Sequence, residues 1–135
     1  MICLFLMLLS GCGPTKQQRV DALKTYRQQY VTSHPELDEK TEKNILDGII
    51  ADEMSREQVI AVMGGRGGGI SKNFSAEGVL ECEVFGPLSV CFSNNKATKT
   101  CITYEAAFGG LRTARTECSP LPAFIGDSLA EYYKP

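Results

Sequence analysis

Cysteines are the residues of this 135-residue chain with the clearest chemical potential. Four of the six lie in its second half, namely Cys82, Cys91, Cys101 and Cys118. An even number of cysteines favours disulfides if the domain is exported, as the N-terminal residues described below indicate, whereas a metal or redox site would favour a Cys-x-x-Cys pair, which is absent. The single histidine, His34, is far from them in the sequence. We therefore predict two disulfides and no metal or cofactor site; buried free thiols and metal or redox chemistry are the alternatives.

A run of glycines at residues 64–69 (Gly-Gly-Arg-Gly-Gly-Gly) invites comparison with phosphate-binding loops. Such loops lead into a helix, whose free N–H groups complete the site. This run instead follows a segment with helical spacing, leads towards segments with strand composition, and contains no Gly-Lys-Ser/Thr. We interpret it as a flexible linker that uses the left-handed conformations available to glycine.

Residues suited to nucleophilic or acid–base catalysis are sparse. A nucleophile needs a neighbouring base, and His34 precedes a proline at an expected helix end, where a capping or solvent-facing role is common. Glu81 and Glu83 share one face of an expected strand, and we expect that face to contact water. We expect no enzymatic activity, no catalytic residue and no small-molecule substrate. A small hydrolase that uses His34 with an unidentified nucleophile is a competing hypothesis.

The N-terminal residues form a short apolar run that ends near a cysteine. Residues 2–9 would extend only about 12 Å as a helix, whereas a membrane core is about 30 Å thick. The length fits the apolar region of a secretory signal. Leu9-Ser10-Gly11-Cys12 resembles the lipobox of bacterial lipoproteins, in which the thiol is acylated and the chain is cut before the cysteine. No Lys or Arg precedes the run, which departs from that pattern.

These features predict a lipid anchor. We expect residues 1–11 to be a lipoprotein signal peptide, Cys12 to carry lipid, and residues 12–18 to form a tether. Gly13 stands where an aspartate commonly retains lipoproteins in the inner membrane, so we expect anchoring in the bacterial outer membrane, facing the periplasm. The alternative is a buried N-terminal strand or helix with an ordinary core cysteine.

The charge balance excludes one class of partner. The chain carries 14 basic and 16 acidic residues, a formal net charge of −2. A nucleic-acid-binding domain of this size would show a basic excess. We therefore expect no nucleic-acid partner.

Three segments in the first half have helical features. Apolar residues recur at three- and four-residue spacing from Val20 to Tyr30. Asp38 offers an N-cap to a second helix, which we expect to end near Gly48. Residues 55–58 form a Ser-x-x-Gln capping box that opens a third helix, and glycines 64 and 65 end it.

The second half is rich in β-branched and aromatic residues. We expect strands at 79–85, 88–93 and 98–107, separated by turn residues. The predicted fold class is α+β, with two to three N-terminal helices packed on one face of a three-stranded antiparallel sheet. The domain would cover residues 19–112, and residues 113–135 would form a C-terminal tail pinned by a disulfide.

The expected register of the strands decides which cysteines can meet. Pairing Val90 with Ile102 keeps the apolar residues of the strands on one face and places Cys91 opposite Cys101. Facing Cα atoms at about 4.5–5.5 Å suit a disulfide, which leaves Cys82 to pair with Cys118. The competing register uses a two-residue turn at 86–87, pairs Cys82 with Cys91, and leaves Cys101 for Cys118. It places two glutamates on the face of Val90, so we favour Cys91–Cys101 with Cys82–Cys118.

The segment from His34 to Gly64 resembles the SmpA/OmlA (BamE-like) family of small outer-membrane lipoproteins. The matching residues are Ile45, Gly48, Met54, Ser55, Gln58, Val59 and Gly64. The chain departs from the family pattern at Glu53, at residues 65–67, and in its first expected strand, which carries a cysteine in place of aromatic residues.

The resemblance implies a non-enzymatic role in outer-membrane assembly or envelope integrity. Such a protein would act through contacts with a periplasmic or outer-membrane protein, and its membrane contact would be the lipid on Cys12. The alternative is a secreted or anchored inhibitor that blocks a periplasmic enzyme, because similar helix-and-strand modules occur in secreted inhibitors.

Overall fold

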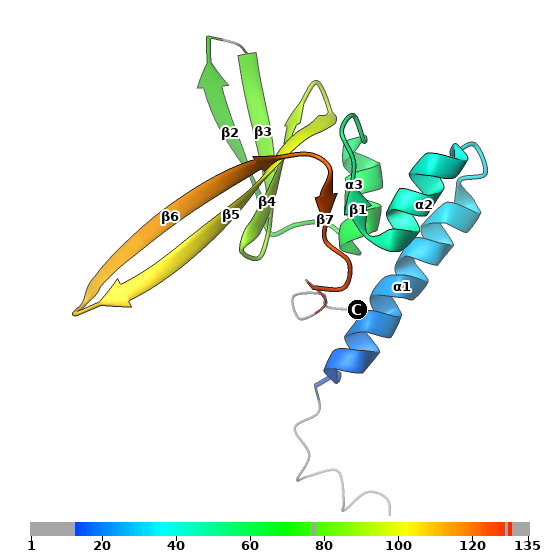
Figure 1. The fold of residues 1–135 in the computed structure, drawn as a ribbon, viewed down its shortest axis with the longest axis horizontal. Helices are drawn as coiled ribbons and strands as arrows, with labels where there is room; N and C mark the ends of the chain where they lie inside the picture. Colours follow the sequence, from blue (N-terminus) through cyan, green and yellow to red (C-terminus); the bar gives the residue numbers. More distant parts are fainter. Residues whose placement is uncertain (1–12, 77, 129, 131–135) are drawn as a thin grey trace, which may run out of the picture.

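The computed structural model describes residues 13–76, 78–128 and 130, which form three helices and seven strands (Figure 1). Cys12 and the expected signal peptide of residues 1–11 lie outside the described residues. The elements, in chain order, are α1 (Lys16–Ser33), α2 (Glu39–Asp47), β1 (Ile49–Ile50), α3 (Arg56–Met63), β2 (Gly69–Ser75), β3 (Gly78–Phe85), β4 (Leu88–Ser93), β5 (Lys96–Phe108), β6 (Leu111–Pro120) and β7 (Ala123–Phe124).

The larger of two sheets has five antiparallel strands in the order β2-β3-β4-β5-β6, and β1 pairs with β7 in a two-stranded sheet. The chain is α+β, but the expectation of a three-stranded sheet is wrong. Strands β3, β4 and β5 match the three expected strands closely, while β2 and β6 add one strand at each edge. Every residue of β6 is exposed, so this strand lacks the alternation of apolar and polar residues that would reveal it in the sequence.

Local sequence signals fix the ends of the helices. Thr15 caps α1, so residues 16–18, which we assigned to a tether, form the first turn of this helix. The carboxylate of Asp38 accepts a hydrogen bond from the N–H of Thr41 at the start of α2. Ser55 and Gln58 form the expected capping box of α3.

The C-terminal cap of α2 also requires a glycine. Gly48 adopts a left-handed conformation with φ of 72°, and a Cβ atom there would lie 2.8 Å from the backbone of Gly126. Gly126 in turn donates its N–H to the carbonyl of Gly48 at 3.0 Å. The end of α2 is therefore a close backbone contact with the C-terminal segment.

Tight turns join the strands of the larger sheet. Two-residue turns connect β3 to β4 at residues 86–87, β4 to β5 at 94–95, and β5 to β6 at 109–110. Asn94 and Asn95 both have positive φ, as do the two glycines at 109–110. These conformations match the twist of antiparallel strands.

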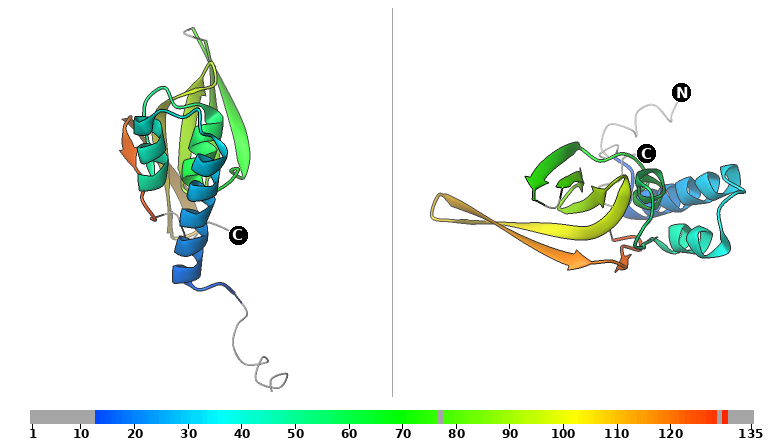
Figure 2. Two further views of the ribbon diagram at one scale, coloured as in Figure 1. Left: turned by 90° about the vertical axis from the view of Figure 1, so that its right-hand side faces the viewer. Right: turned by 90° about the horizontal axis from the view of Figure 1, so that it is seen from above.

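The core lies between the helices and one face of the sheet (Figure 2). The apolar side chains of α3 pack against those of β3 and β4, and α1 and α2 lie beyond α3. Fully buried members include Ile45, Ile50, Val59, Val62 and Val90. The β5–β6 hairpin extends well away from this core in Figure 1.

Candidate functional site

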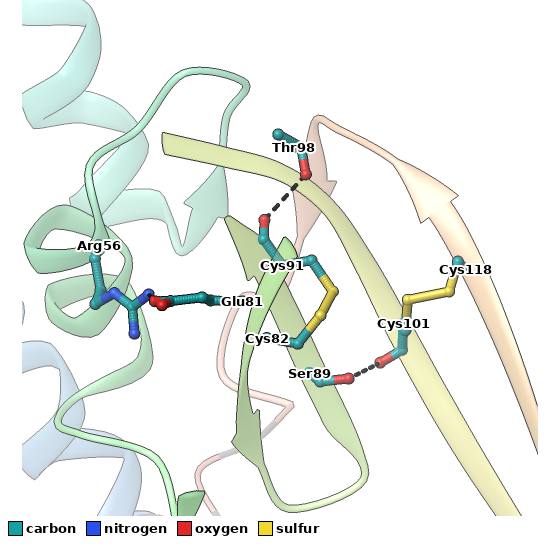
Figure 3. The surroundings of a disulfide bond; sticks show 8 residues. All are labelled: Arg56, Glu81, Cys82, Ser89, Cys91, Thr98, Cys101 and Cys118. Carbon is teal, nitrogen blue, oxygen red and sulfur yellow. Dashed lines mark hydrogen bonds and ion pairs between the residues drawn. A yellow bond between two sulfur atoms is a disulfide. The ribbon is translucent and has the colours of Figure 1, made fainter. Parts of the chain in front are cut away.

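The four C-terminal cysteines form two disulfides on one face of the larger sheet (Figure 3). Cys82 bonds Cys91 across β3 and β4, and Cys101 bonds Cys118 across β5 and β6. The prediction of two disulfides is confirmed, but the favoured pairing of Cys91 with Cys101 and Cys82 with Cys118 is wrong. The competing register gives the observed pairing.

The register differs from the favoured one because the β4–β5 turn is tighter than expected. Ser93 pairs with Lys96 across a two-residue turn, and the ladder shifts by one residue between Cys91 and Phe92. Cys91 consequently faces Lys99, and Cys101 faces Ser89, whose hydroxyl donates to the carbonyl of Cys101 at 3.4 Å. Leu80 packs beside the disulfides on this face, opposite the helices.

An arginine makes the observed register of β3 and β4 possible. Glu81 and Glu83 lie on the face that the helices cover, and not towards water as we expected. Arg56, at the start of α3, reaches Glu81 at 2.6 Å and Glu83 at 3.9 Å. Its guanidinium also lies over the ring of Phe92, 4.7 Å from the centroid.

Glu83 is almost completely buried, with 3% of its surface exposed. Its carboxylate also accepts the N–H of Gly67 at 3.4 Å. A buried carboxylate without such partners would be costly, so Arg56 and Gly67 resolve the mismatch that disfavoured this register. The two carboxylates and the arginine form a structural ion-pair cluster between helix and sheet.

The glycine-rich segment 64–69 connects α3 to β2, as the sequence predicts. Gly68 donates its N–H to the carbonyl of Val84 at 2.8 Å. At Gly67 a Cβ atom would lie 2.3 Å from the same carbonyl oxygen, so the backbone approach admits only glycine. The segment acts as a linker fastened to β3.

His34 lies at the end of α1, stacked on Tyr30 with ring centroids 4.0 Å apart. One of its ring nitrogens lies 2.8 Å from the carbonyl oxygen of Tyr30. These contacts give the histidine a helix-capping position. Among the described residues, no group of three or more His, Cys, Asp or Glu side chains could hold a metal ion.

The C-terminal segment is fastened to α1 by a buried arginine. Arg27, which is 2% exposed, donates to the carbonyl of Val62 at 2.9 Å and to that of Gly126 at 2.7 Å. Asp127 lies 3.5 Å from the same guanidinium. Burial lowers the pKa of Arg27, and the charge of Asp127 opposes this shift. Sequence reasoning missed this residue because it lies at an apolar position of α1.

The residues beyond 112 form structured elements as well as a tail. Residues 113–120 belong to β6, so the strand crosses the boundary that we placed at 112. The disulfide at Cys118 does fasten this region, but to Cys101 of the neighbouring strand. β7 then continues to the pairing with β1.

The hairpins present large apolar side chains to solvent. Phe74 near the tip of β2–β3 is 79% exposed, and Phe108 at the tip of β5–β6 is 78% exposed. Leu111 faces Phe108 across the turn and is also exposed. We use the name hairpin tips for four exposed apolar residues of the two hairpins, namely Phe74, Val79, Phe108 and Leu111.

An open hollow of about 520 Å³ lies at the β3–β4 turn, near the base of the long hairpin. It is lined by Val84, Gly86, Pro87, Leu88, Ser89, Thr103 and Glu105. The lining has a single carboxylate, that of Glu105, among apolar and hydroxyl side chains, so it offers little for catalysis or for binding a specific ligand. The hairpin tips are therefore the stronger candidate for function.

No family model, curated protein or solved structure matches this chain. Within the part of the chain that the structure describes, no helix is long and apolar enough to cross a membrane.

Proposed function

We propose that this chain is a lipid-anchored, non-enzymatic protein that faces the periplasm from the bacterial outer membrane. In this proposal it acts through protein contacts in outer-membrane assembly or envelope integrity. The observation that carries the proposal is the pair of hairpins, whose tips present Phe74, Phe108 and Leu111 to solvent. Exposed aromatic and aliphatic side chains on a rigid support are typical of protein contact sites.

Two further features support this proposal. The disulfides join β3 to β4 and β5 to β6, so they hold both hairpins on the larger sheet. Disulfides persist in oxidising compartments such as the periplasm. The lipobox-like sequence that ends at Cys12 supports export and lipid attachment at the same time. The SmpA/OmlA resemblance of residues 34–64 is the reason for naming the outer membrane.

A second candidate is an inhibitor of a periplasmic enzyme. The β5–β6 hairpin favours it, because the hairpin stands away from the body (Figure 1) and exposes Phe108 and Leu111 at its tip. Such a tip could enter the cleft of an enzyme.

Site-specific photo-crosslinking in cells distinguishes these candidates. A photoreactive residue at Phe108 should crosslink to an envelope protein that fractionates with the outer membrane, whereas the same residue at exposed Lys43 on α2 should not. A crosslink from Phe108 to a soluble enzyme, with loss of that enzyme's activity in the complex, would support inhibition. The same crosslinked proteins in equal yield from Phe108 and Lys43 would contradict a role for the tip in partner contact.

A further inference from the structure

Among the described residues, no strand pairs with the outer edge of β6 in the larger sheet. The strand order ends at β6, and all ten of its residues are exposed. An uncovered strand of this length presents a row of free N–H and C=O groups that can pair with another strand. Its sequence, Leu-Arg-Thr-Ala-Arg-Thr-Glu-Cys-Ser-Pro, has neither lysine nor an internal proline to prevent such pairing.

The turn that precedes β6 fixes which backbone groups face outwards. Gly109 and Gly110 form a two-residue turn with positive φ, so the flanking pair Phe108–Leu111 is hydrogen-bonded. Bonded and non-bonded pairs alternate in an antiparallel ladder. Odd-numbered residues of β6 therefore bond β5, and the outward groups belong to Arg112, Ala114, Thr116 and Cys118.

Pro120 agrees with this assignment. It lies on the outward side of the alternation, where the missing N–H costs no bond to β5. The outward N–H and C=O groups thus form a continuous row from Arg112 to Cys118.

We propose that β6 pairs with β6 of a second copy of this chain, in antiparallel orientation, about a two-fold axis at Thr116. A two-fold axis perpendicular to the sheet keeps each face of the sheet on the same side in both copies. Facing residues then have numbers of equal parity, and Thr116 faces Thr116 of the second copy. Ala114 faces Cys118 of the second copy through outward backbone groups in both chains.

Charge selects this register over its neighbours. With the axis at Thr116, Arg115 faces Glu117 of the second copy, and Glu117 faces the second copy's Arg115. Both side chains are exposed and bond each other along their own strand. Facing opposite charges stabilise a strand pair, and facing like charges destabilise it.

The two nearest alternative registers lack this complementarity. An axis at Arg115 would place the arginines of the two copies opposite each other. An axis at Glu117 would place the glutamates of the two copies opposite each other, and Arg115 opposite Ser119 of the second copy. All three axes pair the outward backbone groups, but only the Thr116 axis gives two reciprocal ion pairs.

This inference goes beyond the proposed function and does not depend on it. The pairing uses residues 112–118 and needs neither the lipid on Cys12 nor an envelope partner. Failure of dimerisation would leave the membrane-anchored role intact, and failure of anchoring would leave the dimer intact.

Charge reversal in the full chain, purified in mild detergent, tests the proposal by sedimentation velocity over a micromolar concentration series. The wild-type chain should show a monomer–dimer equilibrium. Arg115→Glu and Glu117→Arg should each weaken the dimer at least about tenfold, because each variant places like charges opposite each other twice. The double variant Arg115→Glu/Glu117→Arg should restore the dimer, since the reversed pair is again complementary.

Two further measurements test the backbone pairing at the edge of β6 separately from the ion pairs. Thr116→Pro removes an outward N–H without breaking a bond to β5, so it should abolish the dimer while far-UV circular dichroism stays unchanged. Amide exchange of Ala114 and Thr116 should slow as the concentration rises. Lys72→Glu, a charge reversal on the opposite edge strand β2, is the control and should leave the dimer unchanged.

Three results would overturn the proposal. A wild-type chain that sediments as a monomer throughout the series would remove the dimer itself. A double variant that stays as weak as the single variants would exclude the register. Loss of the dimer with Lys72→Glu would place the contact at the other edge of the sheet.

Discussion

Arg27 joins three segments that are far apart in the sequence. Its guanidinium bonds the carbonyl of Val62 at the end of α3 and that of Gly126 near the C-terminus, and α1 supplies the arginine itself. The bond to Val62 is buried and the bond to Gly126 is part-buried, so removal of the arginine takes a donor from two carbonyls with restricted access to water. A single side chain thus secures the packing of the C-terminal segment on the helices.

Arg27→Met should destabilise the protein by about 3 kcal/mol, because it removes one member of a buried polar group and leaves its acceptors unsatisfied. Urea unfolding followed by circular dichroism measures this change. Lys24→Met is the matched control: Lys24 is largely exposed, lies 3.7 Å from Asp127, and should contribute less than about 0.5 kcal/mol. Equal effects of the two variants would contradict the role assigned to Arg27.

Asp38 makes stability depend on pH at the start of α2. The backbone N–H of Thr41 donates to its carboxylate, and this bond lowers the pKa of Asp38. A lowered pKa in the folded state gives stability that is present above about pH 3.9, the usual value for aspartate, and is lost as the pH falls through the lower folded-state pKa. Asp38→Asn should remove the part of the free energy of unfolding that the wild-type chain loses at acidic pH.

Unfolding midpoints of the wild-type chain and Asp38→Asn, measured from neutral to strongly acidic pH, test this linkage. The difference between the two proteins should shrink as the wild-type carboxylate becomes protonated. A difference that stays constant over the whole range would show that the charge of Asp38 does not act on α2.

At the scale of elements, the helices could be predicted from sequence and the sheet only in part. A helix cap depends on residues close together in the sequence. The caps at Asp38 and Ser55, and the glycines that end α2 and α3, can therefore be recognised from the sequence alone. The central strands β3 to β5 carry β-branched and aromatic residues. β2 is mostly polar, and β6 is exposed on both faces, so neither shows the alternation that marks a half-buried strand.

The register of β3 could not be predicted because its decisive partner is remote in the sequence. Glutamates on a buried face are unfavourable in isolation, and Arg56 on α3 provides the compensating charge. The register between β4 and β5 was wrong for a local reason, because Asn94 and Asn95 form a tighter turn than we expected. The two register errors together produced the wrong disulfide pairing. The hairpin tips lie within the predicted domain of residues 19–112, but they were missed because β2 and β6, which complete the two hairpins, were not predicted as strands.

The Arg56–Glu83 contact predicts a strongly non-additive pair of substitutions. Arg56→Met should cost about 3 kcal/mol, since it leaves the buried carboxylate of Glu83 without its cation. Adding Glu83→Leu should recover much of that loss, because the remaining buried surface is then apolar. Urea unfolding of the two single variants and the double variant gives the coupling energy. Additive effects would show that the two side chains act independently.

The two disulfides should contribute comparable stability. They close loops with sequence separations of 9 and 17 residues, and loop-closure entropy gives about 3 kcal/mol for each. The paired variants Cys82→Ser/Cys91→Ser and Cys101→Ser/Cys118→Ser should therefore lower the free energy of unfolding by similar amounts. Non-reducing peptide mapping of the wild-type chain provides the control, and a peptide linking Cys91 to Cys101 would contradict the observed register.

At the scale of the whole molecule, the helices and the long hairpin occupy opposite sides of the body (Figure 1). The first described helix, α1, begins at Lys16, only a few residues after the proposed lipid attachment site. A lipid at Cys12 would therefore hold the body close to the membrane surface. The hairpin tips would remain available to partners near that surface.

Lipid attachment predicts that Cys12→Ala moves the protein from the membrane to the soluble fraction. Acyl chains contribute roughly 0.8 kcal/mol per buried CH₂, so a multiply acylated cysteine holds a protein at a bilayer without any spanning segment. In cells labelled with radioactive palmitate, the wild-type chain should carry label and pellet with membranes in detergent-free buffer. Cys12→Ala should lose both properties, and Cys3→Ala should keep them, since Cys3 lies in the expected signal peptide. A Cys12→Ala chain that still pellets and retains its palmitate would rule out this cysteine as the anchor.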